Sequence, residues 1–535
     1  MQSTQLRTLR KEFWETKAPD DRKHAWSTPA SLIVNSSEDA TTMFNTAGMQ
    51  PLVPYLMGKP HPTGAKRVYN IQWCIRTVDI EEVGDMHHLT YFEMMGNWSL
   101  GDYFKKEAVA WSREFLTKWI KLDPEMMSVT VFEWDNDAPR DEETANLWKE
   151  LWVSNHRITY LWKSDNRRWP AWESGPCGPD TEIFYWVWEG TPPVDSNPWN
   201  DDEQWMEIRN NVFMAYYKDA DGNFSELENK NVDTGMGFER LCMVLQHKDT
   251  PWVVLTEKSV YDTDIFQSLL KPLDLQKFSL QARRIIADHT RTAAMLMEEW
   301  LAPSNEWRGY VLRRIIRRMY FQWYQSNQDN VEIEHYLTWC ISVLQTFYGK
   351  WFDDVAQRML QEVTQFDKTI KNGKQMLESY IQKHSSLSTL PWAQAFKLYD
   401  TYWYPIDLTV EVAQQHGWTV DLEGYTHEVE EARKIARAWA SKKFAKWVDR
   451  AAVVDGMPQT RFVWYDVLEA EGMNLLKDVT VEWQRVLIFD RTPMYAESWG
   501  QKWDSWVVTL DSGEKLQIID VQKYGWVFLH MVENS

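Results

Sequence analysis

Cysteine is scarce in this chain. Its four cysteines are widely separated and include no CxxC pair (Cys74, Cys177, Cys242 and Cys340). Small disulfide-stabilised domains need a much higher density of cysteine, so a disulfide framework is excluded and a reducing, cytoplasmic environment is expected. Cys177 lies between proline and glycine without an evident partner base, which favours a structural turn over a thiol nucleophile.

Long apolar runs are also missing. No stretch of about 18 apolar residues occurs, and the N-terminal MQSTQLRTLR lacks the apolar segment of a signal peptide. We therefore expect a soluble protein that has no membrane partner.

The chain also lacks GxxxxGK[ST], GxGxxG and HExxH motifs, and no two of its 12 histidines are four residues apart. These absences argue against the common nucleotide-binding loops and against zinc catalysis.

Positive charge and glycine are both in deficit. Lys and Arg number 58 against 78 Asp and Glu, which gives a net charge of −20. Nonspecific binding to DNA needs an excess of cations, so DNA is not an expected partner, although a local basic patch could serve one RNA.

Glycine numbers 22 beside 33 tryptophans, where a typical share of about 7% predicts roughly 37 glycines. Bulky indoles therefore stand where small residues are expected.

The pattern of apolar residues divides the chain into three expected domains. Residues 1–247 mix short apolar runs with helical stretches, which predicts an α+β domain on a mainly antiparallel sheet. Residues 248–455 follow a helical period. Residues 456–535 return to short strands around the turn Asp511-Ser-Gly513, which predicts a small C-terminal β-barrel.

Polar residues and glycines are unusually dense between residues 72 and 104. The run Gln72-Trp-Cys-Ile-Arg-Thr-Val-Asp-Ile-Glu-Glu-Val-Gly84 precedes His87-His-Leu-Thr-Tyr-Phe-Glu-Met-Met-Gly-Asn-Trp-Ser-Leu-Gly-Asp-Tyr-Phe104. A plain strand–loop–strand would explain the apolar positions but not this density of functional groups. The two runs strongly resemble the second signature motif of the alanyl-tRNA synthetases, a family of class II ligases.

Further stretches agree with this family in order and spacing. They are 175–182, 207–214, 231–240 (which resembles the third class II motif), 288–291, 303–318, 398–405 and 490–501. The resemblance therefore spans nearly the whole chain. It implies a class II catalytic domain (1–247), a helical domain for the tRNA acceptor stem (248–455) and a β-barrel. The implied activity is ATP-dependent joining of alanine to alanine tRNA, with ATP and Mg²⁺ as cofactors and no metal site formed by the protein.

The resemblance assigns roles in ATP binding and activation. Arg76 matches the residue that bridges the α-phosphate and the alanine carboxylate, a task that suits a forked guanidinium because it holds two oxygens at fixed geometry. Phe92 and Arg240 match the ring and the guanidinium that enclose adenine. The implied ATP-binding set is Arg76, His88, Phe92, Glu93, Met94 and Arg240, with Arg76 and Arg240 as catalytic residues.

The resemblance also assigns contacts to alanine and to tRNA. Asp233 matches the carboxylate that binds the ammonium group, Asn210 a polar contact and Val212 part of the pocket wall. The implied alanine-binding set is Arg76, Arg209, Asn210, Val212, Asp233 and Gly235. The implied tRNA-binding set is Asn305, Arg313, Arg314 and Asp400, in which Asn305 and Asp400 read the G·U pair of the acceptor stem. Without the family resemblance, the usual interpretation of such an arginine-rich helix is a solvent-exposed face with no ligand.

Tryptophan and arginine replace family residues systematically. Tryptophan stands for glycine at Trp172, Trp300, Trp307, Trp403 and Trp499, and arginine for tryptophan at Arg113, Arg168 and Arg209. Indoles do not suit turn positions with positive φ. Our hypothesis is that the source bacterium reads UGA as glycine and some CG-starting arginine codons as tryptophan. The printed chain would then result from translating the gene with the wrong codon table. Taken at face value, Arg209 would place a charge in the wall of the alanine pocket.

The editing function of the family is not evident. Its metal-binding spacings, His-x3-His and Cys-x3-His, are not found in the chain. An alanine pocket cannot strongly reject glycine or serine, because one methylene is worth only about 1–3 kcal/mol, so mischarging is expected unless a separate protein corrects it. A monomer is expected, since the family's C-terminal oligomerisation domain does not follow. The alternatives are an impaired paralogue that binds tRNA or an amino acid without charging, and a fragment that acts only with its missing half.

Overall fold

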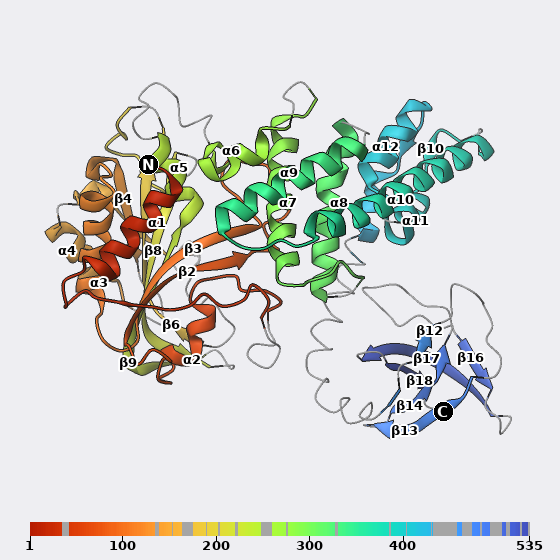
Figure 1. Ribbon diagram of the computed structural model, residues 1–535, viewed down its shortest axis with the longest axis horizontal. Coiled ribbons are helices and arrows are strands. Elements are labelled where there is room, and N and C mark those ends of the chain that lie inside the picture. Colours follow the sequence, from red (N-terminus) through yellow and green to blue (C-terminus); the bar gives the residue numbers. More distant parts are fainter. Residues whose placement is uncertain are drawn as a thin grey trace. The chain divides into compact units, whose positions relative to one another are not determined.

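Two compact units make up the chain, Met1–Thr364 and Gln365–Ser535. Figure 1 shows the computed structural model. It describes all residues except 35–41, 134–138, 152, 163–174, 189, 202–203, 220–222, 248–258, 274–276, 306, 327–329, 385–386, 403, 430, 432–456, 459, 463–472, 482–483, 493–505, 510–513, 525–526 and 533–535. No helix within the described ranges is long and apolar enough to cross a membrane.

A mixed β-sheet is the base of the first unit (Figure 1). Its described strands run in the order β1-β2-β3-β9-β8-β7-β4-β5, and β6 pairs with β8. The pairs β1–β2 and β4–β5 are parallel, whereas the central pairs are antiparallel. The predicted α+β class is confirmed. The strands are β1 (Ala25–Trp26), β2 (Arg67–Ile75), β3 (Tyr91–Ser99), β4 (Met127–Phe132), β5 (Ile158–Leu161), β6 (Gly175–Cys177), β7 (Asp180–Trp186), β8 (Trp205–Lys218) and β9 (Phe224–Gly237).

Helices pack against this sheet and then take over the chain. Those in the sheet region are α1 (Ser3–Lys11), α2 (Val53–Leu56), α3 (Lys105–Glu114), α4 (Glu142–Glu150) and α5 (Phe238–His247). They are followed by α6 (Asp264–Leu270), α7 (Leu280–Glu298), α8 (Trp307–Ser326), α9 (Asn330–Tyr348) and α10 (Val355–Lys383). Helix α7 begins where the Ser279 side chain accepts a hydrogen bond from the backbone N–H of Ala282. Most of α7 is buried, so it serves as the core of the helical region.

The second unit begins within α10 and ends in a β-sheet. Helices α11 (Trp392–Tyr402) and α12 (Ile406–Gln415) accompany the strands β10 (Thr389–Leu390) and β11 (Thr419–Val420). The strands that follow are β12 (Arg461–Phe462), β13 (Leu475–Val481), β14 (Gln484–Phe489), β15 (Arg491–Thr492), β16 (Trp506–Thr509), β17 (Lys515–Tyr524) and β18 (Val527–Val532).

Five of these strands form an antiparallel sheet with two apolar faces. Its order is β13-β14-β18-β17-β16. Leu487 and Phe489 belong to one buried cluster and Val486 and Ile488 to another, as the alternation of side chains along a strand requires. A closed barrel remains a prediction. So do the domain boundaries at 247/248 and 455/456, which adjoin residues 248–258 and 432–456, outside the described ranges.

Two tryptophans occupy backbone conformations that ordinarily require glycine. Among the described residues, Trp300 has a φ of 66° and Trp307 a φ of 49°. Trp300 follows Glu299, the C-cap residue of α7, and its N–H donates to the Met297 carbonyl oxygen at 3.0 Å. Glycine is favoured at this position after a helix. Burial does not offset the strain, because Trp300 is 81% and Trp307 45% exposed. The codon hypothesis stays a prediction, and glycine at these two positions would remove the strain. The replaced positions Trp172, Arg168, Trp403 and Trp499 lie outside the described residues.

Trp300→Gly should stabilise the protein. We expect the free energy of unfolding to rise by about 1 kcal/mol, because glycine adopts positive φ without a steric penalty. Urea unfolding followed by circular dichroism measures the change. The matched control is Trp351→Gly, which removes another exposed indole, 77% exposed, from a residue whose φ is not positive. A gain of the same size in both variants would contradict the strain argument.

Candidate active site

Cross-strand register brings distant motifs onto one face of the sheet. Strand β8 lies between β7 and β9 and aligns two rows of residues across them: Asp180, Val212 and Asp233 in one row, and Glu182, Asn210 and Gly235 in the next. Positions two apart on a strand share a face, so both rows face the same side. The family motifs at 175–182, 207–214 and 231–240 therefore meet at one place.

The indole of Trp98 closes one end of this face. Its Nε1 donates a hydrogen bond to Asp233 Oδ1 at 2.6 Å. Gly96 makes room for the ring, because a β-carbon there would lie only 2.1 Å from Trp98 Cη2. Val212 is buried in the same apolar cluster as Trp98. Side chains of β3, β8 and β9 thus pack together here, and their role as the wall of a small amino-acid pocket stays a prediction.

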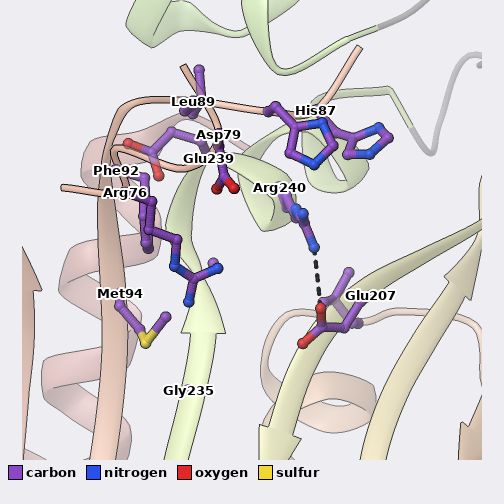
Figure 2. A pocket seen from close by; sticks show the side chains of 13 residues that line it. Arg76, Asp79, His87, Leu89, Phe92, Met94, Glu207, Gly235, Glu239 and Arg240 are labelled. Carbon is purple, nitrogen blue, oxygen red and sulfur yellow. Dashed lines mark hydrogen bonds and ion pairs between the residues drawn. The ribbon is translucent and has the colours of Figure 1, made fainter. Parts of the chain in front are cut away.

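A pocket opens beside these rows (Figure 2). Its lining brings together five of the six residues expected to bind ATP and the alanine-site residue Gly235. The lining residues are Arg76, Asp79, His87, His88, Leu89, Phe92, Met94, Glu207, Ile208, Gly235, Gly237, Glu239 and Arg240.

Arg76 and Phe92 form one side of the pocket. Arg76 Nε donates to the Thr46 carbonyl oxygen at 3.2 Å, and its guanidinium carbon lies 4.9 Å from the centre of the Phe92 ring. A guanidinium held over an aromatic face is stabilised by the ring quadrupole. Figure 2 shows both groups on the same wall, with Met94 two residues beyond Phe92 on β3. Arg76 is therefore oriented before any ligand binds.

Arg240 faces this wall from helix α5 and is paired with Glu207. Their charged groups lie 3.2 Å apart, as the dashed line in Figure 2 shows. Glu207 reaches the pocket because the β7–β8 register shifts: Ile183 pairs with Arg209, but Phe184 pairs with Glu207. The extra residue on β8 changes the direction of the following side chains, as bulges near functional sites do.

His88 is held by Asp85 at the edge of the pocket. Asp85 Oδ1 accepts from the backbone N–H groups of His87 and His88, at 3.0 and 2.8 Å, while Oδ2 lies 2.5 Å from His88 Nδ1. This side-chain contact raises the pKa of His88. Partial burial alone would raise the pKa of Asp85, but the hydrogen bonds from His88 outweigh it and hold that pKa below its usual range. Asp85, His87 and His88 are also close enough to hold a metal ion.

Glu93 lies on the opposite face of β3 from Phe92 and Met94. We expected it in the ATP site, but strand alternation turns its carboxylate toward helix α1. Arg7 Nη2 donates to both oxygens, at 2.7 and 2.6 Å, and Tyr348 OH donates to Oε1 at 3.2 Å. The side chain of Glu93 is fully buried.

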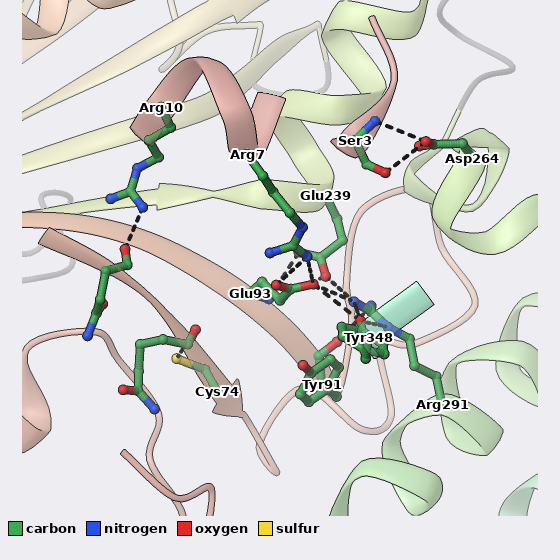
Figure 3. A network of polar contacts seen from close by, with 12 residues as sticks. Ser3, Arg7, Arg10, Cys74, Tyr91, Glu93, Glu239, Asp264, Arg291 and Tyr348 are labelled. Carbon is green, nitrogen blue, oxygen red and sulfur yellow. Dashed lines mark hydrogen bonds and ion pairs between the residues drawn. The ribbon is translucent and has the colours of Figure 1, made fainter. Parts of the chain in front are cut away.

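A buried network extends from Glu93 to the helical region (Figure 3). The Glu93 backbone N–H contacts Glu239 Oε2 at 3.1 Å, and Arg291 Nη2 donates to Glu239 Oε1 at 2.5 Å. Arg291 Nη2 also donates to Tyr348 OH at 2.7 Å. Burial raises the pKa of Glu239, whereas Arg291 opposes that rise. The network connects α1, β3, α5, α7 and α9, and it adjoins the pocket because Glu239 is also one of the lining residues.

Arg209 does not enter the alanine pocket as expected. It lies on the face opposite Asn210, where its Nε donates to Ser112 Oγ at 2.9 Å and to Asn211 Oδ1 at 3.0 Å. Its Nη2 donates to Asn97 Oδ1 at 2.8 Å. We expected Arg209 beside Asn210 in the alanine site, but successive residues of a strand point to opposite faces of the sheet. Burial lowers the pKa of Arg209 to about 10.

The arginines of α8 make contacts within the protein. Arg313 donates to Asn305 Oδ1, and Arg314 donates to Glu81. Arg313 also forms an ion pair with Glu362 at 3.2 Å. Asn305 and Arg313 are thus neighbours, and their role in a tRNA site stays a prediction. The side chain of Asp400 lies outside the described residues.

Several side chains of the site were not anticipated. Asp180 and Glu182 stood within a recognised motif, and their alternation with Thr181 could have placed them on the Asn210 face. Arg7 carried no local signal, and Arg291 stood in the recognised stretch 288–291 without an assigned role, because each pairs with a glutamate far away in the sequence.

The comparisons with known proteins agree with this geometry. A protein-family model described as tRNA synthetases class II (A) matches residues 9–535. The chain therefore belongs to the class II tRNA synthetases, and more narrowly to the alanine–tRNA ligase family, as three relatives of that name show.

The alanine–tRNA ligase of Treponema pallidum is 40% identical over 463 residues, which are 83% of this chain and 73% of that protein. That of Treponema denticola is 41% identical over 462 residues, 82% of this chain and 73% of that protein. That of Rubrobacter xylanophilus is 35% identical over 539 residues, 96% of this chain and 58% of that protein.

Arg291→Met should destabilise the protein strongly. The change leaves Glu239 buried without its charged partner, which costs about 3–5 kcal/mol. Equilibrium unfolding in urea at pH 7 measures this loss. Adding Glu239→Gln should restore part of it, because the uncompensated charge is then removed. A double variant that is no more stable than Arg291→Met alone would contradict the ion-pair account.

Proposed function

We propose that this chain joins alanine to alanine tRNA in two steps at the described pocket. An alanine carboxylate oxygen attacks the α-phosphorus of ATP, forming alanyl-adenylate and releasing pyrophosphate. The terminal ribose 3′-hydroxyl of the tRNA then attacks the carbonyl carbon, forming the ester and releasing AMP. The observation that carries the proposal is the convergence of Arg76, Phe92 and Arg240 on one pocket next to Asn210 and Asp233.

Electrostatic positioning explains the first step. The attack brings an anion against a phosphate, so negative charge must be neutralised while the reactants are held in line. Arg76 is anchored by Thr46 and the Phe92 ring, which leaves its forked guanidinium pre-oriented to bridge a carboxylate and a phosphate oxygen. Phe92 and Arg240 lie on opposite sides of the pocket in Figure 2, where they could enclose adenine.

The pocket also suits a divalent cation bound with ATP. Mg²⁺ prefers oxygen ligands and usually combines one or two carboxylates with substrate phosphates. Asp79 and Glu207 supply carboxylates in the lining. When bound, Mg²⁺ would supply positive charge to the polyphosphate, while Arg76 and His88 supply charge from the protein.

We assign the acceptor stem to the α8 region. Asn305 and Asp400 are proposed to read the G·U pair, and Arg313 and Arg314 to contact the tRNA. The contact between Arg313 and Asn305 supports this assignment, because a cation that holds the reading amide can also approach the phosphate backbone.

Arg76→Ala should nearly abolish alanine activation. Alanine-dependent exchange of pyrophosphate into ATP should fall by about 10²–10³-fold, the usual effect of removing one transition-state donor. The control is Arg140→Ala, an arginine paired with Glu142 away from the pocket, which should keep full exchange. A chain that shows no alanine-dependent exchange before substitution, as a non-catalytic paralogue would, contradicts the proposal.

ATP binding should weaken as pH rises through the pKa of His88. This pKa is raised, so the imidazolium is present below it and is lost above it. The KM for ATP in the exchange assay should therefore increase at higher pH. Asp85→Asn removes the hydrogen bond that raises the pKa, so the increase should move to lower pH. Identical pH profiles for the two proteins would count against a role for this pair.

A further inference from the structure

Asn210 lies at the centre of the aligned rows and is fully buried. Its Nδ2 donates to Asp180 Oδ2 at 2.8 Å and to Glu182 Oε1 at 3.2 Å. Both acceptors belong to β7, two residues apart on the face that Asn210 shares. The amide is therefore held between two carboxylates.

These carboxylates determine which end of the amide faces them. An ionised carboxylate accepts hydrogen bonds and cannot donate them. The atom that contacts both is the NH₂ group, whereas a reversed amide would place its oxygen against two acceptor oxygens. The Asn210 oxygen is consequently directed away from β7.

That oxygen is an unsatisfied acceptor in the interior. Asn210 Oδ1 is buried and has no hydrogen-bond partner among the residues that the structure describes. Leaving such an acceptor unpaired is unfavourable, because the group has lost its hydrogen bonds to water. Its cross-strand neighbour is Gly235, which lines the pocket and has no side chain to cover the amide. A donor supplied by a ligand would satisfy it.

We propose that Asp180 and Glu182 are positioning residues for the amino-acid site. They hold the Asn210 amide so that Oδ1 accepts a hydrogen bond from the ammonium group of alanine. Asp233, one row away on β9, adds the opposite charge. The inference rests on the proposed function and adds to it how the ammonium group is oriented.

The double variant Asp180→Asn/Glu182→Gln tests this arrangement. The new amides can present either an oxygen or an NH₂ group, so Asn210 can rotate without repulsion. We expect the KM for alanine in pyrophosphate exchange to rise about tenfold or more, the effect of losing a hydrogen bond to a charged group. The KM for ATP should remain unchanged.

The single variants are the matched controls. Asp180→Asn and Glu182→Gln each leave one carboxylate to hold the amide, so each should raise the KM for alanine less than half as much as the double variant. A purely structural role would lower the melting temperature without separating the two KM values. Exchange with an unshifted KM for alanine in the double variant would overturn this inference alone. Absence of alanine-dependent exchange by the unsubstituted chain would overturn the proposed function and this inference with it.

A crystal structure of the unsubstituted chain with an alanyl sulfamoyl adenosine analogue gives a test that needs no variant to fold. We expect the ammonium nitrogen about 2.7–3.2 Å from Asn210 Oδ1. A nitrogen that is instead bonded only to the carboxylates of Asp180 and Glu182, with Asn210 Oδ1 facing elsewhere, would overturn the inference.

Discussion

Two buried glutamates and the arginines that neutralise them are the constraint on which the pocket depends. Glu93 and Glu239 lie in the interior, where an unpaired carboxylate is costly. Arg7 reaches Glu93 from α1, and Arg291 reaches Glu239 from α7. Glu93 stands between Phe92 and Met94, and Glu239 precedes Arg240, so the network fixes the residues that line the pocket. Glu93 and Arg7 pair on the face of β3 opposite Phe92 and Met94, whereas Glu239 both pairs with Arg291 and lines the pocket.

Strand register completes the site. Asp233, Asn210 and the β7 carboxylates become neighbours only because β8 pairs with both β7 and β9 in one register. Side chains alternate between the two faces of β8. Asn210 therefore faces the proposed amino-acid site, while Arg209 faces α3 and neutral hydrogen-bond acceptors. A shift of one residue would exchange these two side chains. The amino-acid site thus depends on hydrogen-bonded pairing between strands that are far apart in the sequence.

Motifs predicted much of the site, and tertiary geometry decided the rest. Arg76, Phe92, Met94 and Arg240 meet in the pocket as the order of the motifs implied. Glu93 and Arg209 were misplaced, because a motif names a strand residue without showing which face it takes. The partner of Arg291 could not be anticipated from the stretch 288–291, since Glu239 lies on another helix 52 residues away. At Trp300 the sequence identified an unusual residue, a tryptophan where the family has glycine. The structure then showed why it is unfavourable, because its φ is positive.

The central claim is that one active site in this chain both activates alanine with ATP and transfers it to the tRNA. The most direct measurement is charging of an alanine tRNA transcript with radiolabelled alanine by the purified chain and Mg-ATP. The account predicts alanyl-tRNA with a transcript that carries the G·U pair, and a large loss when the pair is G·C. Adenylate formation without charging of either transcript, or equal charging of both, would contradict it.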